Sequence, residues 1–245
     1  MRNIVVTGAS SGLGKAITQY CVRRGDHVIL ADIAVEQGEA LAHQINASGG
    51  SARFCLVDLG NPKSIERLSY EVSQQEGKIH GLVNNAAIAS GLGGTRFEDI
   101  DIDVWDRVMQ VNVRGTWLIS RAFSPLLKDN IGRIVNIASD TALWGQSHLL
   151  AYVASKGAVI AMTKSLSREL GLRRIGVIGL APGLMRNAAT EAVPEERHKE
   201  YELRRAIPGP QVPEDVVETV HFCLSAGALA LTGQIIPTNA GSYCH

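Results

Sequence analysis

The sequence predicts one α/β domain, built as a doubly wound parallel sheet of seven strands with helices on both faces. Short apolar runs rich in β-branched residues alternate along the chain with stretches that have the apolar spacing of helices. The strand-like runs are continuously apolar, as in parallel strands that are buried on both faces. A chain of 245 residues commonly fits one such fold, so we expect residues 1–245 to form a single domain.

The elements can be placed in chain order from these patterns. The expected strands are NIVVTG (3–8), HVILAD (27–32), ARFCLVD (52–58), GLVNNAA (81–87), RIVNIAS (133–139), GVIGLAPG (176–183) and QIIPTN (234–239). The expected helices span 12–24, 34–47, 62–76, 101–128, 151–171 and 213–226. Residues 184–212 interrupt the alternation, because they are charged and carry several prolines. We interpret this segment as a substrate lid, with a surface loop that carries a short helix as the alternative.

Composition excludes several classes of function. Lys and Arg together number 24, and Asp and Glu together also number 24. The chain therefore has no excess positive charge that would favour binding to nucleic acid or to an anionic membrane. The four cysteines (Cys21, Cys55, Cys223 and Cys244) show neither CxxC pairs nor zinc-ligand spacing, which argues against a metal site or a disulfide framework. The start MRNIVVTG does not resemble a signal peptide, and no run approaches 18 apolar residues. We therefore expect a cytoplasmic protein that binds a small molecule.

A glycine-rich turn follows the first strand directly, in TGASSGLGKAI (7–17). Glycine suits positions where the backbone turns with positive φ and where a phosphate must approach closely. The following helix N-terminus supplies N–H groups and a positive dipole to an anion. This position between strand and helix predicts a dinucleotide site of the Rossmann type. Its expected cofactor contacts are Gly8, Ser10, Ser11, Gly12, Leu13 and Gly14.

Asp32 ends the second strand and predicts NAD rather than NADP as the cofactor. Its carboxylate can accept hydrogen bonds from both hydroxyls of the adenosine ribose. A 2′-phosphate would be repelled by this charge, and neither Ser11 nor Ile33 offers the cation that a phosphate needs. The alternative is that Asp32 only caps the following helix.

Two further strands end in polar residues, Asp58 after the third and NNAA (84–87) at the fourth. In open α/β sheets ligands bind at the carboxyl ends of the strands. We expect Asp58 to meet the adenine amino group, unless it only caps the next helix, and Asn85 to hold the local backbone. The same wall is expected to include Leu59, Ala86, Ala87, Ile33, Pro182, Gly183 and Leu184.

A tyrosine and a lysine stand four positions apart in AYVASKGAVIAMTKSL (151–166). That spacing places Tyr152 and Lys156 on one face of a helix, one turn apart. Taken alone, the pair is more simply interpreted as a half-buried aromatic residue and a surface cation whose stem packs on apolar groups. The remaining motifs favour a functional pair.

With the glycine turn, Asp58, NNAA, Asn112 in MQVNVRG, Ser139 in IVNIAS, YVASK and Pro182-Gly183 in this order, the chain resembles the short-chain dehydrogenase/reductase family. The resemblance covers nearly every residue. It implies hydride transfer between NAD and a secondary alcohol or ketone, with Lys156 on the nicotinamide ribose and Ser139 on the substrate oxygen. The catalytic residues it implies are Asn112, Ser139, Tyr152 and Lys156.

Tyr152 is the expected general base for alcohol oxidation and the general acid for ketone reduction. The free phenol pKa near 10 is too high for a base at neutral pH, so we expect the positive charges of Lys156 and of oxidised nicotinamide to lower it. Asn112, within an expected helix, is interpreted as holding a water that relays the proton past Lys156, with a surface asparagine as the alternative.

Two positions depart from the family pattern. Ala87 stands where the family usually has glycine after NNA, which narrows the floor beneath the adenosine. Asn187 stands where many relatives carry a threonine that bonds the nicotinamide carboxamide. An asparagine amide can replace that hydroxyl but has a different reach, so its role is left open.

The expected substrate residues are Ser139, Trp144, His148, Leu149, Tyr152 and Leu184. Their mostly apolar character suits a small organic ligand. Trp144 is expected to stack on an aromatic ring, or alternatively to pack in a loop or subunit contact. His148 can add a hydrogen bond or a second proton path. The lid and the helix after it look most similar to bacterial enzymes that oxidise aryl or alicyclic secondary alcohols, and a diol is a further candidate.

Two other functions stay open at this point. One is a 3-oxoacyl carrier-protein reductase, although those enzymes generally use NADPH, which Asp32 disfavours. The other is a non-catalytic NAD-binding sensor or scaffold, which would have no need of Tyr152. Segments 101–128 and 151–171 carry apolar residues on more than one face, among them Trp105, Trp117, Val153 and Ile160. Because relatives pair these helices, we expect a homo-oligomer, with a tetramer favoured.

Overall fold

The computed structural model describes residues 1–244, with all side chains except that of residue 189. Seven parallel strands form one sheet in the order β3-β2-β1-β4-β5-β6-β7, which confirms the predicted doubly wound α/β fold. The strands are β1 (Asn3–Thr7), β2 (His27–Asp32), β3 (Ala52–Leu56), β4 (Gly81–Asn84), β5 (Arg133–Ile137), β6 (Gly176–Pro182) and β7 (Ile235–Thr238).

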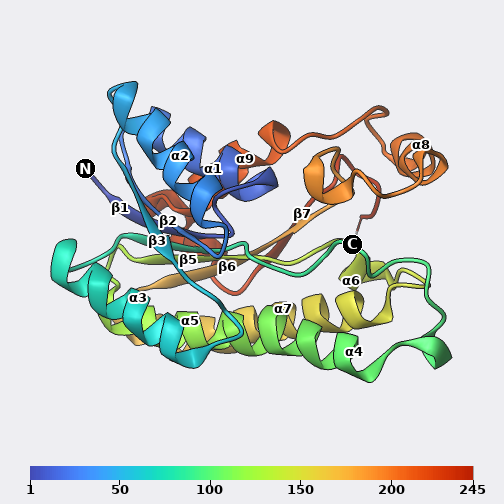
Figure 1. Cartoon of the computed structure of the whole chain (residues 1–245), viewed down its shortest axis with the longest axis horizontal. Helices are drawn as coiled ribbons and strands as arrows, with labels where there is room; N and C mark the ends of the chain where they lie inside the picture. Colours follow the sequence, from blue (N-terminus) through green and yellow to red (C-terminus); the bar gives the residue numbers. More distant parts are fainter. Residues whose placement is uncertain (245) are drawn as a thin grey trace.

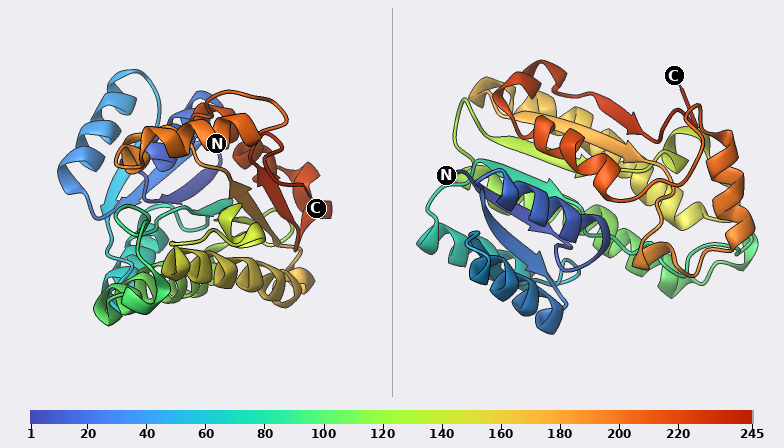
Figure 2. Two further views of the ribbon diagram at one scale, coloured as in Figure 1. Left: turned by 90° about the vertical axis from the view of Figure 1, so that its right-hand side faces the viewer. Right: turned by 90° about the horizontal axis from the view of Figure 1, so that it is seen from above.

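Helices cover both faces of this sheet (Figure 1). One layer consists of α1 (Gly12–Arg23), α2 (Val35–Ala47) and α9 (Glu214–Cys223), and the other of α3 (Pro62–Gln75), α5 (Thr116–Phe123) and α7 (Leu150–Glu169). Consecutive strand residues point to opposite faces, so Val6 belongs to the core under α1 and α9 and Val5 to the core under α3 and α5. The left view of Figure 2 shows the sheet between these two layers.

The strand order reverses between β1 and β4, and this is where a crevice opens at the carboxyl ends of the strands. The hydroxyl of Thr7, the last residue of β1, accepts hydrogen bonds of 3.0 Å from the backbone N–H groups of Asn85 and Ala86. It also donates to the carbonyl of Val83 at 3.3 Å. The ends of β1 and β4 are therefore held side by side, and both lead into the crevice.

The expected helix over 101–128 is divided in the structure. It consists of α4 (Ile102–Val108), a π-helical turn (Met109–Gly115), α5 and a 3₁₀ turn (Ser124–Leu126). The hydroxyls of Thr116 and Ser120 donate to carbonyls four residues earlier, at 2.8 and 2.7 Å, a pattern that disturbs regular helix geometry. The apolar spacing continues through the π turn, which is why the sequence pattern predicts one unbroken helix.

Residues 184–212 lie at one end of the molecule (Figure 1) and include a 3₁₀ turn (Ala188–Thr190) and α8 (Glu195–Arg204). Two arginines hold this segment in shape. Arg186 pairs with Glu195 at 2.9 Å and with Glu202 at 2.7 Å. The buried Arg205 guanidinium donates to the carbonyls of Leu184 and Gly209.

The face formed by α4, the π turn, α5 and α7 exposes several large apolar side chains. Trp117 is 46% exposed and Ile102 is 75% exposed. A shallow hollow on this face is lined by Met109, Val113, Trp117 and Met162 among others. Within residues 1–244, no helix is long and apolar enough to cross a membrane, and no cluster of His, Cys, Asp and Glu could hold a metal ion.

Candidate active site

One large cavity lies at the carboxyl ends of the strands. Its volume of about 1110 Å³ exceeds the range of about 300 to 1,000 Å³ that is typical for one drug-sized ligand, which leaves room for a second ligand. The predicted residues on its wall are Gly8, Ser11, Gly12, Leu13, Asp32, Ile33, Asp58, Leu59, Asn85, Ala86, Ala87, Ser139, His148, Leu149, Tyr152, Lys156, Pro182, Gly183 and Leu184.

Four predicted site residues do not line this cavity: Ser10, Gly14, Asn112 and Trp144. Ser10 contributes through its backbone, since its N–H donates to Asp32, while its hydroxyl is buried without a hydrogen-bond partner among the described residues. The other three lie behind the wall and contact residues that form it: Gly14, Asn112 and Trp144.

The glycine turn has the shape that a bound phosphate requires. Gly8 and Gly12 adopt positive φ values of +63° and +50°, which residues with a side chain rarely adopt. A Cβ on Gly14 would lie 1.9 Å from the carbonyl oxygen of Gly8. Ser11, the N-cap of α1, makes no side-chain hydrogen bond to the first turn, so the N–H groups of that turn are available to an anion. The turn therefore fits a dinucleotide pyrophosphate.

Asp32 holds the glycine turn and also faces the cavity. Its carboxylate oxygens accept hydrogen bonds from the N–H groups of Ser10 at 2.8 Å and Ala34 at 3.0 Å. Ala34 is the N-cap of α2, so Asp32 braces the turn before the helix and is not its cap. A carboxylate has about four acceptor positions, which leaves Asp32 free positions for ribose hydroxyls.

Asp58 and Asn85 also stabilise the backbone around the cavity. The Asp58 carboxylate accepts from the N–H of Gly60 at 2.8 Å. The cap of α3 is Asn61, whose side chain accepts from Lys63 at 3.0 Å, so the capping alternative for Asp58 was wrong. Asn85 donates to the carbonyls of Thr7 and Gly8 at 2.9 and 3.1 Å, as its expected role in holding the local backbone requires. Sequence analysis missed Thr7, although its place directly before Gly8 was a usable signal.

Asn112 is buried in the π turn, which excludes a surface asparagine. Its side-chain amide donates to the Ile88 carbonyl at 3.0 Å and to the Ser155 hydroxyl at 3.1 Å, and its oxygen accepts from the Ile88 N–H at 2.7 Å. Both amide hydrogens are thus engaged by protein groups. Asn112 thereby fastens the segment after β4 to α7, and the relay water expected at this residue stays a prediction.

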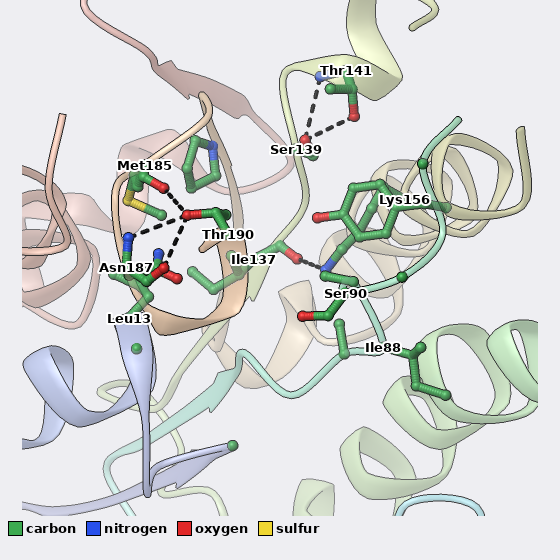
Figure 3. A pocket seen from close by; sticks show the side chains of 18 of the residues that line it. Leu13, Ile88, Ser90, Ile137, Ser139, Thr141, Lys156, Met185, Asn187 and Thr190 are labelled. Carbon is green, nitrogen blue, oxygen red and sulfur yellow. Dashed lines mark hydrogen bonds between the residues drawn. The ribbon is translucent and has the colours of Figure 1, made fainter. Parts of the chain in front are cut away.

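Ser139 follows β5 and is oriented by a residue that sequence analysis missed. Its hydroxyl lies 2.9 Å from the hydroxyl of Thr141 and accepts from the Thr141 N–H at 3.3 Å (Figure 3). Thr141 begins the short helix α6 (Thr141–Trp144) and lines the same cavity. A second hydroxyl two positions after Ser139 was the available signal.

Lys156 and Tyr152 share one helix face, and both side chains are affected by desolvation. The buried Lys156 ammonium donates to the Ile137 carbonyl at 2.7 Å (Figure 3) and lies 5.7 Å from the centre of the Tyr152 ring. Burial lowers the pKa of Lys156 to about 8 and raises the pKa of Tyr152 to about 12. A hydrogen bond with Ser139 opposes the rise, and the charge of Asp140 adds to it. The prediction that Lys156 and oxidised nicotinamide together lower the pKa of Tyr152 stays a prediction, and desolvation is the effect that they would have to overcome.

Residues of the 184–212 segment line part of the cavity, among them Met185, Val193 and Tyr201. Tyr201 of α8 is buried on the wall, and its ring lies 6.2 Å from the ring of Trp144. Trp144, the last residue of α6, thus packs against Tyr201 of α8, and Tyr201 lines the cavity while Trp144 does not. The Tyr201 hydroxyl donates to Gln146, another wall residue, at 3.5 Å. No sequence signal distinguished Tyr201 from its charged neighbours in the lid.

Asn187 lies close to the glycine turn, as Figure 3 shows beside Leu13. Its side-chain oxygen lies 3.8 Å from the position that a Cβ on Gly12 would take. The Thr190 hydroxyl bonds the backbone of Asn187 and of Met185, and both Thr190 and Met185 line the cavity. These two residues occur in a segment without a regular pattern, so no sequence motif pointed to them.

Comparison with known proteins gives a consistent picture. The family model described as short chain dehydrogenase matches residues 2–198. The chain is 32% identical to a 3-oxoacyl-[acyl-carrier-protein] reductase of Thermotoga maritima, covering 97% of this chain and 96% of the relative. It is 31% identical to a 7alpha-hydroxysteroid dehydrogenase of Bacteroides fragilis, covering 99% of this chain and 94% of the relative. It is 32% identical to 2-(S)-hydroxypropyl-CoM dehydrogenase 3 of Xanthobacter autotrophicus, covering 97% and 95%.

Solved structures are similar over the same length. A dehydrogenase/reductase from Sinorhizobium meliloti superposes with a TM-score of 0.92 at 29% identity, covering 99% of this chain and 95% of that chain. A short-chain dehydrogenase/reductase of the glucose/ribitol dehydrogenase type from Brucella melitensis superposes with a TM-score of 0.91 at 28% identity, covering 100% of this chain and 97% of that chain.

The Gly14→Ala variant tests whether the glycine turn binds the dinucleotide. The added methyl group would meet the Gly8 carbonyl oxygen at 1.9 Å, so the turn must move. Because misplacement by about 1 Å is costly in such sites, we expect affinity for reduced nicotinamide dinucleotide to fall at least about tenfold in fluorescence titration. Gly171→Ala is the matched control, since nothing lies within 4 Å of its added methyl group. A folded Gly14→Ala protein with unchanged affinity would contradict the assignment.

Proposed function

The chain belongs to the short-chain dehydrogenase/reductase family and is an NAD(P)-dependent oxidoreductase acting on CH–OH groups, and from this premise we propose that it transfers a hydride between NAD and a secondary alcohol or its ketone. The observation that carries the proposal is that one cavity is lined by Asp32, after the glycine turn, and by Ser139 and Tyr152. β2 and β5 lie on opposite sides of the sheet centre, so the cavity spans the distance between a nucleotide and a reacting carbon.

The residues divide the work of alcohol oxidation between them. Ser139 donates a hydrogen bond to the substrate oxygen, with its own hydroxyl held by Thr141. Tyr152 accepts the hydroxyl proton as the carbonyl double bond forms and the hydride leaves the same carbon. Bound oxidised nicotinamide supplies the hydride acceptor and a positive charge near the phenol. Lys156 keeps its position through Ile137, and Asn112 positions the segment after β4 and α7. Reduction follows the same path in reverse.

The cofactor we propose is NAD, in keeping with Asp32 at the end of β2. The described residues on the cavity wall include these Arg and Lys side chains: Arg107, Lys156 and Arg197. None of these belongs to the glycine turn or to β2. A 2′-phosphate beside Asp32 would therefore meet a negative charge without a cation from those two elements.

For the substrate we propose an aryl, alicyclic or diol secondary alcohol. The wall contributes apolar side chains from Leu149, Leu184, Met185 and Val193, together with the ring of Tyr201. Polar side chains on the same wall, among them Ser139, Gln146, His148 and Thr190, could orient a compact organic ligand. The second candidate is reduction of a 3-oxoacyl carrier-protein thioester, which is favoured by the relatives of Thermotoga maritima and Aquifex aeolicus that bear this name, at 32% identity each.

A substrate plate tests cofactor and substrate class together. Reduced-nicotinamide absorbance is followed with aryl carbinols, alicyclic alcohols, diols and 3-hydroxyacyl thioesters, each with NAD and with NADP. We expect turnover with NAD on the first three classes. In Asp32→Asn, loss of the charge should raise the NADP to NAD ratio of kcat/KM at least about tenfold, whereas Asp58→Asn, on the same wall, should leave it unchanged. Wild-type preference for NADP, or activity confined to the thioesters, would favour the reductase.

Tyr152→Phe tests the proposed base. Removing the hydroxyl should reduce kcat by at least about 10²-fold and leave dinucleotide affinity within about twofold by fluorescence titration, since the ring remains. Because the pKa of Tyr152 is raised and oxidation requires the deprotonated phenol, we also expect wild-type kcat/KM for oxidation to rise with pH above neutrality. Reduction should stay nearly constant over the same range, because the phenol remains protonated until the pH approaches its raised pKa. Full turnover by Tyr152→Phe would remove Tyr152 from the mechanism.

We also propose a homotetramer that associates through the face of α4, the π turn, α5 and α7. The exposed Trp117 supports this face, as does the adjoining hollow, in which Met109, Val113 and Met162 lie beside Asp106, Gln110 and Arg114. Light scattering should give about four times the chain mass, and Trp117→Glu should shift the protein to smaller species because it places a charge in an apolar contact. Phe222→Glu, at an exposed position on α9, is the control and should not. A monomeric wild-type protein would contradict the proposal.

A further inference from the structure

Two side chains of α8 in the lid line the cavity, Arg197 and Tyr201. They stand four positions apart and therefore lie on one face of the helix. The Tyr201 hydroxyl donates to Gln146 at 3.5 Å, and Gln146 follows α6 in the segment between Ser139 and Tyr152. Arg197 and Tyr201 thus belong to the end of the cavity that holds Ser139 and Tyr152, which we call the substrate end. Figure 1 shows α6 and α8 at this same end of the molecule.

The charges on the cavity wall are divided between its two ends. Asp32 ends β2 and Asp58 follows β3, so both wall carboxylates lie at the nucleotide end. A Cβ on Gly60 would lie 3.1 Å from Asp58 Oδ1 and 3.3 Å from Arg107 Nη1, which places Arg107 at that end too. At the substrate end, the described wall residues include no Asp or Glu. A negatively charged ligand group there meets no carboxylate on the wall.

A lysine and an arginine stand on the wall at the substrate end, Lys156 and Arg197. Lys156 is buried and donates to the Ile137 carbonyl. Arg197 is 36% exposed, and its Nη1 donates to Glu200 Oε2 at 2.9 Å. The other oxygen of this carboxylate lies 3.7 Å from Arg204 Nη1, so two guanidinium groups share one carboxylate. The cluster has one positive charge in excess, and Arg197 is its member on the cavity wall.

Aromatic rings hold the Arg197 guanidinium in place. Its Cζ lies 5.8 Å from the centre of the Tyr201 ring, and the Arg204 Cζ lies 5.1 Å from the centre of the Trp144 ring. The two rings are 6.2 Å apart, so cations and rings form one stack between α6 and α8. Within residues 1–244, the Arg197 guanidinium makes one hydrogen bond, to Glu200, which leaves most of its N–H donors available. An anion in the cavity therefore meets a guanidinium that is already positioned.

On the premise of the proposed hydride transfer from a secondary alcohol, we propose that the substrate also carries a carboxylate group and that Arg197 binds it. The hydroxyl-bearing carbon lies at Ser139 and Tyr152, and the apolar part of the substrate packs on the Tyr201 ring. A carboxylate matches the planar fork of the guanidinium, which donates two parallel hydrogen bonds to it. Its single negative charge balances the positive charge that Glu200 leaves uncompensated. Arg197 is thus a specificity-determining residue.

The test compares an aryl carbinol that carries a para carboxylate with its primary amide, which has nearly the same shape and no charge. Wild-type kcat/KM with NAD should favour the acid at least about fivefold, because the pair is charge-assisted but partly exposed. Arg197→Gln should bring the two substrates to within about twofold of one another. Lys199→Gln, at an exposed position of α8 outside the cavity wall, is the matched control and should keep the preference. A purely structural role for Arg197 would lower both values equally and leave their ratio unchanged.

A binding measurement separates this inference from the proposed function. The ketone forms of the same two compounds have no hydride to give to NAD, so calorimetry can measure their affinity for the NAD-loaded protein without turnover. The ketone acid should bind at least about fivefold more tightly than the ketone amide in the wild type and in Lys199→Gln, and this difference should be lost in Arg197→Gln. Higher salt should narrow it. If Arg197→Gln does not fold, Arg197→Met keeps an apolar stem, removes the charge and should give the same result.

The outcomes distinguish the two ideas. Tighter binding of the ketone acid, lost in Arg197→Gln, in a protein that oxidises no alcohol would support the role of Arg197 and overturn the proposed function. Turnover of both alcohols at equal kcat/KM, with equal affinity for both ketones, would support the function and overturn the role of Arg197. A preference for the acid that survives in Arg197→Gln would overturn that role as well, as would binding of neither ketone by the wild-type protein.

Discussion

The Thr7 hydroxyl joins the ends of two central strands, and the position of the cavity follows from that junction. It accepts from the N–H groups of Asn85 and Ala86, while the Asn85 amide donates back to Thr7 and Gly8. A Cβ on Gly8 would lie 2.9 Å from the Ala86 Cα, and a Cβ on Gly14 would lie still closer to Gly8. The start of α1 is therefore pressed against the end of β4. The N–H groups of its first turn and the residues after β4 must then face one crevice.

At the other end of the cavity, burial competes with the charges that acid–base chemistry needs. The same desolvation that lowers the pKa of Lys156 raises that of Tyr152, so neither side chain is stabilised in its charged form by burial. Lys156 is compensated by the Ile137 carbonyl. Tyr152 has a hydrogen bond with Ser139 and is opposed by Asp140. Burial thus favours the protonated form of Tyr152, and positive charge from bound oxidised nicotinamide would favour the phenolate.

The predictions that succeeded were those in which chain neighbours decide the outcome. The alternation of strands and helices follows from local apolar spacing, and the glycine turn follows from residues a few positions apart. Those that needed correction depend on contacts between distant segments. Asn112 was expected within one unbroken helix, but it lies in a π turn and its side chain meets the backbone of Ile88, 24 residues away in sequence. Trp144 was expected on the substrate wall, but α8 brings Tyr201 there and leaves Trp144 behind it.

By itself, the sequence determined the seven-stranded fold, the glycine turn, the spacing of Tyr152 and Lys156, and the family, because each is written in periodicity or in short motifs. Only the tertiary structure decided which side chains face the cavity and in which direction burial shifts their pKa values. Desolvation depends on all atoms around a group, and for Asp140 these come from the strand end, the lid and the C-terminal segment. No local sequence pattern shows these neighbours, since Asn239 stands 99 residues from Asp140 and contacts it only in the folded sheet.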